Sequence, residues 1–158
     1  MAIMLSLTLI IGIVEKNIPF DAVVPGVKLG LSNVIILMAI YIFDFPSSLL
    51  LVTLKCVMLV IVTGNASSFV YSLSGSLLSF FVMWITVYLT RKNERISPVG
   101  VSVLGAVFHN FGQIFAAAFM LGSVNVVYYL PILVISGVVT GVIVGFTVKY
   151  SLPHIKKL

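Results

Sequence analysis

Residues 98–121 read PVGVSVLGAVFHNFGQIFAAAFML, an apolar stretch long enough for one membrane crossing. A transmembrane helix needs about 20 residues, and a charged side chain at its centre costs roughly 3 kcal/mol on insertion scales. The stretch contains no Asp, Glu, Lys or Arg, but it holds His109, Asn110 and Gln113 near its middle. It therefore predicts a membrane helix that carries polar side chains at mid-depth.

The whole chain is also predominantly apolar. Apolar residues make up 61% of its 158 positions and charged residues 8%. Soluble domains are about half apolar and a quarter charged. The composition predicts an all-α integral membrane protein formed by a single transmembrane domain, residues 1–158, and this length holds at most about six spans.

Five more apolar stretches predict the remaining membrane helices. They cover residues 2–14, 28–43, 47–63, 69–90 and 127–148. The last of them carries Gly137, Gly141 and Gly145, a repeat of small residues every four positions that allows another helix to approach its backbone closely. We therefore expect a six-helix membrane bundle with a tightly packed sixth helix.

The positions of the basic residues predict the orientation. Lys and Arg collect in cytoplasmic loops, and here they concentrate in Arg91–Arg95 and in a tail with Lys149, Lys156 and Lys157. Six spans place these two segments on the same side of the membrane. Both termini are then cytoplasmic, in a multi-pass membrane protein.

Several polar side chains are expected at membrane depth, on different helices. Lys55 lies near the middle of 47–63, and His109 lies about eleven residues, roughly 16 Å, from the inner end of its helix. Lys28 is at the outer mouth of 28–43, with Asn33 roughly 7–8 Å deeper. The side chains predicted to line one outward-facing pocket are Glu15, Lys28, Asn33, Lys55, His109, Asn110 and Gln113.

Such a pocket suits a small molecule with an anionic or polar head. The lysines and a protonated His109 would supply positive charge, the amides would orient the ligand, and apolar walls would hold the rest of an amphiphile. The alternative is that these residues pair with one another or with backbone carbonyls and only hold the helices together. The segment Ile18–Gly26 is likewise open to two interpretations, a lid over the pocket or a segment resting on lipid headgroups.

Sequence motifs for catalysis are absent. The four acidic residues are scattered, so no paired carboxylates can hold magnesium on a diphosphate, and no nucleotide-binding or nucleophile motif occurs. Cys56 is the single cysteine, and the basic residues form no patch interleaved with exposed aromatics. The sequence predicts a protein that is not an enzyme, needs no cofactor or metal, and binds membrane lipid but no nucleic acid.

Three strings in this order resemble a bacterial family. They are PGVKLGLSN at 25–33, SPVGVSVLGAVFHNFGQ at 97–113 and YLPILVISGVVTG at 129–141. The family is labelled heptaprenyl diphosphate synthase component I and is also called the Gx transporter family, and the likeness covers nearly the whole chain. That family in turn looks like the substrate-binding S components of energy-coupling-factor (ECF) transporters, which are small six-helix membrane proteins.

The resemblance implies uptake of a vitamin-like molecule or a prenyl or quinone precursor. The partners would be a transmembrane T component and two cytoplasmic ATPases, which would hydrolyse the ATP. The older family name implies a different role, as a membrane subunit or regulator of a prenyl diphosphate synthase. A third alternative is a standalone secondary carrier, coupled through protonation of His109.

Overall fold

The helices begin and end at residues whose local chemistry favours a boundary. Ser97 caps the helix Pro98–Leu121 by accepting a hydrogen bond from the Gly100 N–H at 3.4 Å, and Pro98 occupies its first turn. Gly122, in the left-handed region at φ +59°, ends that helix. Gly64, at φ +66°, ends the helix Phe45–Thr63 in the same way.

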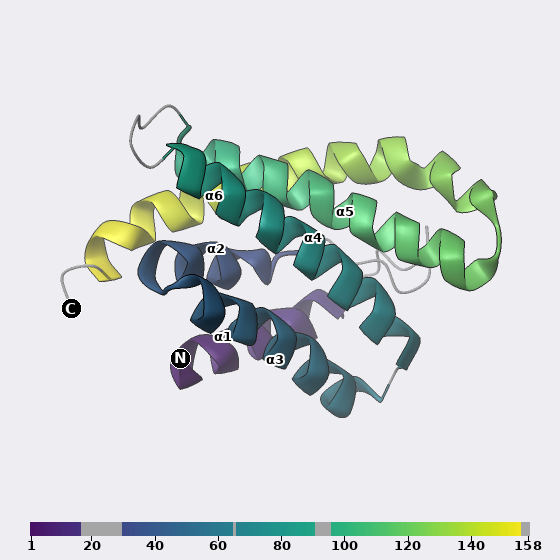
Figure 1. The fold of residues 1–158 in the computed structure, drawn as a ribbon, viewed down its shortest axis with the longest axis horizontal. Helices are drawn as coiled ribbons and strands as arrows, with labels where there is room; N and C mark the ends of the chain where they lie inside the picture. The colour runs from purple at the N-terminus through teal and green to yellow at the C-terminus, as the bar shows by residue number, and fades with distance from the viewer. Residues whose placement is uncertain (17–29, 65, 91–95, 156–158) are drawn as a thin grey trace.

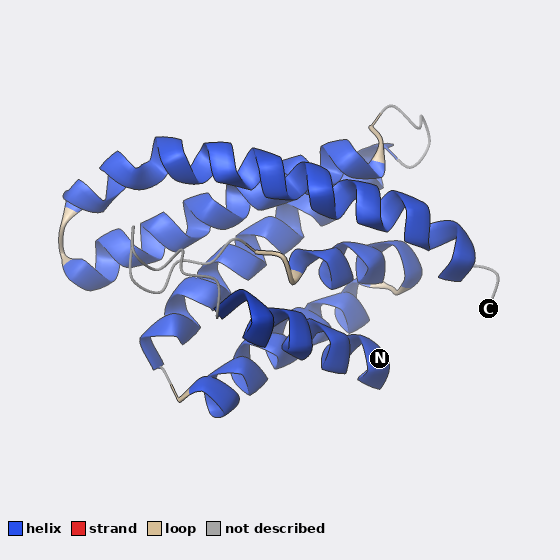
Figure 2. Cartoon of the chain, turned by 180° about the vertical axis from the view of Figure 1, so that it is seen from behind, coloured by secondary structure: helices blue, strands red, loops and turns tan. Residues whose placement is uncertain are grey.

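The computed structural model describes residues 1–16, 30–64, 66–90 and 96–155. These residues form α1 (Ala2–Lys16), α2 (Asn33–Ile42), α3 (Phe45–Thr63), α4 (Ala66–Thr90), α5 (Pro98–Leu121), the 3₁₀ helix η1 (Val124–Tyr129) and α6 (Leu130–Ile155). Figure 2 shows helices and connecting turns and no strand in the described part of the chain. The all-α class predicted from composition is confirmed.

Four stretches in the described part are long and apolar enough to cross a membrane, namely 45–62, 69–90, 98–121 and 124–155. α1 and α2 are apolar but shorter. The first predicted helix continues two residues further, to Lys16, and the sixth runs on to Ile155 rather than ending at 148. The prediction of a helix over 28–43 was wrong at its start: α2 begins at Asn33, because Gly30 adopts φ +79° and the chain turns there.

Successive helices run in opposite directions along the bundle (Figure 1). Both termini lie at one end, together with the end of α4 and the start of α5 (Figure 1). α5 packs between α4 and α6, and α2 contacts each of the other five α-helices. This arrangement fits a multi-pass membrane protein with α2 at its centre.

α2 supplies much of the apolar core. Residues 35–40 are all buried, on every side of the helix. They pack with Leu51 and Val52 of α3, Phe80 and Met83 of α4, and Val148 of α6. A helix that is apolar all round is stable only when it is enclosed, and here its neighbours enclose it.

The outer surface is also apolar. Phe115 and Phe119 of α5 and Ile135 of α6 are among many large apolar side chains left exposed by the bundle. A soluble monomer rarely shows so much contiguous apolar surface. The surface therefore fits a lipid environment, which also explains why apolar residues dominate the composition.

The glycine repeat on α6 packs against α5, as predicted. A Cβ on Gly141 would lie 2.7 Å from Val103 Cα, and one on Gly145 would lie 2.5 Å from Val99 Cα. Gly112 of α5 is equally close to α4, where a Cβ would lie 2.6 Å from the Ser74 carbonyl oxygen. Close backbone contacts of this kind are how membrane helices associate without a hydrophobic driving force.

Candidate functional site

A cluster of polar side chains lies inside the bundle, where α1 ends, α2 begins, and α3, α4 and α5 pass one another. Each member is at most 5% exposed. We call the following set the polar cluster: Glu15, Asn33, Lys55, Ser76, Ser79, His109 and Gln113. Five of the seven residues predicted to line a pocket are therefore brought together.

Lys55 is the cation of the polar cluster. Its Nζ donates to Ser76 Oγ of α4 at 3.1 Å, and among the described residues this is its one hydrogen bond. The ammonium has three N–H donors and is 2% exposed. A buried charge is costly unless it is paired and hydrogen-bonded; the Glu15 carboxylate acts electrostatically on Lys55, and Ser76 is its hydrogen-bond partner within the described residues.

The turn before α2 joins α1 to the polar cluster. The Gly30 N–H donates to Glu15 Oε1, which holds the end of α1 against the start of α2. A Cβ on Gly30 would lie 3.0 Å from Asn33 Nδ2 and 3.1 Å from His109 Cδ2, so glycine lets this turn approach both side chains. The turn thus lies against Asn33 and His109 and is tied to Glu15 at the end of α1.

The side-chain amide of Asn33 has a hydrogen-bond partner at one end only. Its Nδ2 donates to Ser79 Oγ at 3.5 Å, while its Oδ1 has no partner in the described part of the chain. Ser79 lies three residues after Ser76, the partner of Lys55, so both serines occupy one face of α4 a single turn apart. Lys55 and Asn33 therefore approach the same short segment of α4.

His109 and Gln113 form a pair on α5. Their Nε2 atoms lie 2.7 Å apart, one helical turn along the same face. With the amide nitrogen as donor, Nε2 of His109 accepts, as it does in a neutral imidazole. The pair faces Gly75 of α4, where a Cβ would lie 2.8 Å from Gln113 Cγ and 3.0 Å from His109 Cε1.

Asn110 lies outside the polar cluster. Its Nδ2 donates to the Leu133 carbonyl of α6, and a Cβ on Gly137 would lie 2.7 Å from that nitrogen. The side chain belongs to the α5–α6 contact and not to the polar cluster. Lys28 and the predicted lid Ile18–Gly26 lie outside the described residues.

Ser76 and Ser79 were not among the predicted site residues. In a membrane helix, serine can serve both as a small residue that lets helices pack closely and as a hydrogen-bonding group. The available signal was their spacing of three residues, which places both hydroxyls on one face opposite the helix of Lys55.

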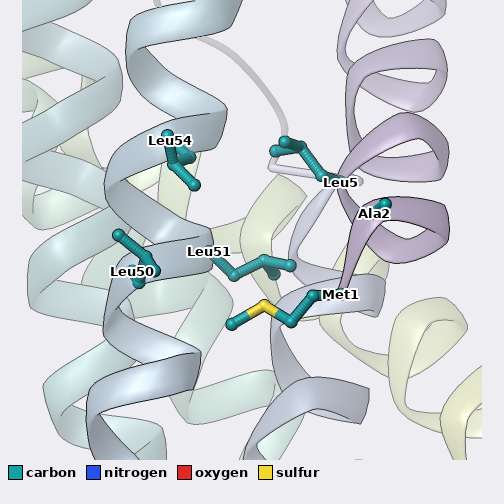
Figure 3. A pocket seen from close by; sticks show the side chains of 6 residues that line it. All are labelled: Met1, Ala2, Leu5, Leu50, Leu51 and Leu54. Atoms are coloured by element: carbon teal, nitrogen blue, oxygen red, sulfur yellow. The ribbon is translucent and has the colours of Figure 1, made fainter.

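Two cavities lie outside the polar cluster. One, of about 280 Å³, is formed by apolar side chains of α1, of α3 and of Met1, which precedes α1 (Figure 3): Met1, Ala2, Leu5, Leu50, Leu51 and Leu54. The other, of about 850 Å³, lies between the α2–α3 turn, the end of α4 and the start of α5. Tyr41, Asp44, Trp84 and Tyr88 are among its lining residues.

The described ranges contain no group of three or more His, Cys, Asp or Glu that could hold a metal ion. The polar cluster offers one ammonium, one carboxylate, two amides, an imidazole and two hydroxyls. This set can bind and orient a small polar molecule by charge and hydrogen bonds.

Comparison with known proteins places the chain in a family. No curated protein matches it, and no solved structure matches it. A family model described as heptaprenyl diphosphate synthase component I matches residues 4–151, which include all of the polar cluster. The chain belongs to the heptaprenyl diphosphate synthase component I family.

Proposed function

We propose that this protein is a substrate-binding membrane subunit that holds a small anionic molecule at the polar cluster. The observation that carries the proposal is the buried ammonium of Lys55, which has Ser76 as its single hydrogen-bond partner among the described residues. Ionisable residues inside a membrane protein usually mark a substrate or ion pathway. An anionic ligand would complete the coordination of Lys55.

We further propose that the protein works as the S component of an ECF-type uptake transporter in the bacterial plasma membrane, with both termini in the cytoplasm. The six-helix bundle and the resemblance of the family to S components support this role. The protein itself would perform no chemistry, and a T component with two cytoplasmic ATPases would supply the energy.

Substrate binding can be tested by affinity selection. The purified protein in lipid nanodiscs is incubated with a small-molecule extract of bacterial cells, washed, and analysed for retained compounds by mass spectrometry. Wild type is expected to retain at least one anionic compound that Lys55→Met loses by tenfold or more. Lys149→Met, which removes an exposed lysine of α6, is the matched control and should retain it.

Thermal unfolding of the same variants separates binding from folding. Because Lys55 is buried with one hydroxyl partner in the described part of the chain, Lys55→Met should unfold at the same temperature as wild type or higher. Equal retention by wild type and a folded Lys55→Met would rule out the polar cluster as the binding site.

The family description favours a second candidate, a membrane component of a prenyl diphosphate synthase. The cavity of about 850 Å³ gives a partner protein a place to bind, since Thr90 and Ile96 line it on either side of the basic connection 91–95. Tyr88 also lines it and is 72% exposed.

A co-purification assay distinguishes the two candidates. If the synthase role is correct, the soluble synthase subunit should co-purify with wild type and with Lys55→Met, but several-fold less with Tyr88→Arg. Tyr150→Arg, at an exposed tyrosine of α6 outside the cavity, is the matched control. If the synthase subunit does not co-purify with wild type, the synthase role is excluded.

A further inference from the structure

The cavity of about 850 Å³ between the α2–α3 turn, the end of α4 and the start of α5 is rich in aromatic side chains. Its volume lies within the range of small-molecule sites, about 300–1,000 Å³. The rings that line it are those of Tyr41, Phe43, Phe45, Trp84 and Tyr88. The ring centroids of Phe45 and Trp84 are 5.2 Å apart and their planes meet at 75°, so ring faces point in more than one direction. Such faces are electron-rich and attract organic cations, those of tryptophan most strongly.

A carboxylate accompanies these rings. Among the described residues that line the cavity, Asp44 is the one that carries a charge. It occupies the N-cap position of α3, where an aspartate usually accepts a backbone N–H of the first turn, but here its side chain makes no capping hydrogen bond. Asp44 is exposed and stands in the chain between Phe43 and Phe45. A carboxylate beside aromatic faces is a combination that binds an ammonium group.

A simpler explanation covers only part of these observations. Tyr and Trp gather at both surfaces of a membrane, and an aromatic belt alone would account for Trp84 and Tyr88 near the end of α4. A belt requires neither a cavity of this size nor an uncapped carboxylate at its wall. The cavity therefore points to a bound cation.

An apolar face of α4 leads away from the cavity. Phe81, Ile85 and Leu89 are exposed, and their spacing of four residues puts them on one side of the helix. The face begins at the cavity, because Tyr88 lines the cavity beside Leu89 and the Phe45 ring lies 6.2 Å from that of Phe81. A ligand with its cationic head in the cavity can lay an acyl chain along this face.

We propose that this cavity binds the ammonium headgroup of a membrane phospholipid, with the cation held by Asp44 and the rings of Trp84 and Tyr88. The site is separate from the polar cluster, since the cavity takes in Ile40–Ile42 at the end of α2 whereas Asn33 begins that helix. It does not depend on substrate binding at the polar cluster. It gives the cavity a lipid occupant in place of the synthase subunit of the second candidate.

Trp84 provides a direct readout, because it is the single tryptophan of the chain and lines the cavity. The purified protein in dodecyl maltoside is titrated with dihexanoyl-phosphatidylethanolamine while tryptophan emission is recorded. A saturable change is expected, with an affinity at least tenfold higher than for either of two reference probes. Dihexanoyl-phosphatidylglycerol has the chains but no ammonium, and ethanolammonium chloride has the ammonium but no chains.

The glycerol lipid is a demanding reference. The net charge of +5 attracts an anionic lipid to the protein as a whole. A preference for the zwitterionic ethanolamine lipid runs against that attraction and therefore reports recognition within the cavity.

Variants test the two kinds of contact. Asp44→Asn should weaken binding of the ethanolamine lipid at least fivefold, whereas Asp44→Glu keeps the charge and should bind within about twofold of wild type. Tyr88→Leu should weaken binding several-fold, and Tyr150→Leu, at an exposed tyrosine of α6 outside the cavity, is the matched control. All three side chains are exposed, so the variants should fold as wild type does, which thermal unfolding checks.

The other outcomes overturn the proposal in distinguishable ways. Equal affinity for the two lipids, or unchanged affinity in folded Asp44→Asn, would mean that the cavity does not recognise an ammonium. Equal affinity for ethanolammonium and the ethanolamine lipid would mean that the ligand is a free ammonium compound and not a lipid. If no probe changes the Trp84 emission, the cavity is left to the protein partner of the second candidate.

Discussion

His109 and Asn110 are neighbours in the chain, yet their side chains contact different helices. Consecutive residues of an α-helix point about 100° apart, so His109 faces α4 while Asn110 faces α6. His109 pairs with Gln113 inside the polar cluster, and Asn110 bonds to the backbone of Leu133. At the residue scale, the polar run of α5 therefore has two tasks, one in the proposed binding site and one in helix packing.

Alanine at each position should separate these tasks. Asn110→Ala removes a buried hydrogen bond between α5 and α6 and should lower the free energy of unfolding by about 1 kcal/mol, with ligand retention unchanged. His109→Ala should weaken ligand retention several-fold while the protein still folds. Thermal unfolding in detergent and affinity selection measure the two effects, and loss of retention in a folded Asn110→Ala protein would contradict the assignment.

The sequence identified the unusual residues but not their partners. Lys55, His109 and Gln113 could be singled out from the sequence as candidate site residues, because polar side chains at membrane depth are costly and usually functional. Asn110 satisfied the same criterion, and only the rotation of α5 against its neighbours separates it from His109. Ser76 could not be singled out, since a serine in a membrane helix is equally well explained by close packing.

At the element scale, α2 departs most from expectation. The apolar stretch predicted a span over 28–43, but the helix covers ten residues and is buried on all sides. Hydropathy cannot distinguish a lipid-facing helix from an enclosed one, because both are apolar. The positive φ of Gly30 was not predictable from composition either, as glycines occur throughout these helices.

The packing of α6 on α5 gives a prediction at this scale. Gly145→Ala would place a Cβ 2.5 Å from Val99 Cα, and because backbone must move to relieve that overlap, the free energy of unfolding should fall by about 1–3 kcal/mol. In the control Gly12→Ala, the nearest atom is Leu59 Cδ1 at 3.1 Å, at the end of a side chain that can shift. Thermal unfolding should show a large decrease in stability for Gly145→Ala and a small change in stability for Gly12→Ala.

At the scale of the whole molecule, the alternation of six helices was predictable from the number of apolar stretches. The structure places both termini, the end of α4 and the start of α5 at one end of the bundle (Figure 1), which is the arrangement that the basic segments required. That this end is cytoplasmic remains a prediction from the positive-inside rule.

Labelling with a membrane-impermeant maleimide tests the orientation. Ser123 follows α5 at one end of the bundle, and Asp44 is exposed in the α2–α3 turn at the other. Ser123→Cys should react in intact cells, whereas Asp44→Cys should react only after permeabilisation. The parent protein is the control, since its Cys56 is buried and should stay unlabelled. Labelling of Asp44→Cys in intact cells would mean that the orientation is inverted.

The enclosed α2 also affects how the protein is made. At 1.5 Å per residue its ten residues extend about 15 Å, half of a hydrocarbon core roughly 30 Å thick. A helix of this length is a poor substrate for insertion on its own as the ribosome delivers it. We therefore expect α2 to reach its final place late, after the helices that follow it in the chain have entered the membrane and formed the surroundings that enclose it. On this expectation, biogenesis depends on synthesis of the later helices.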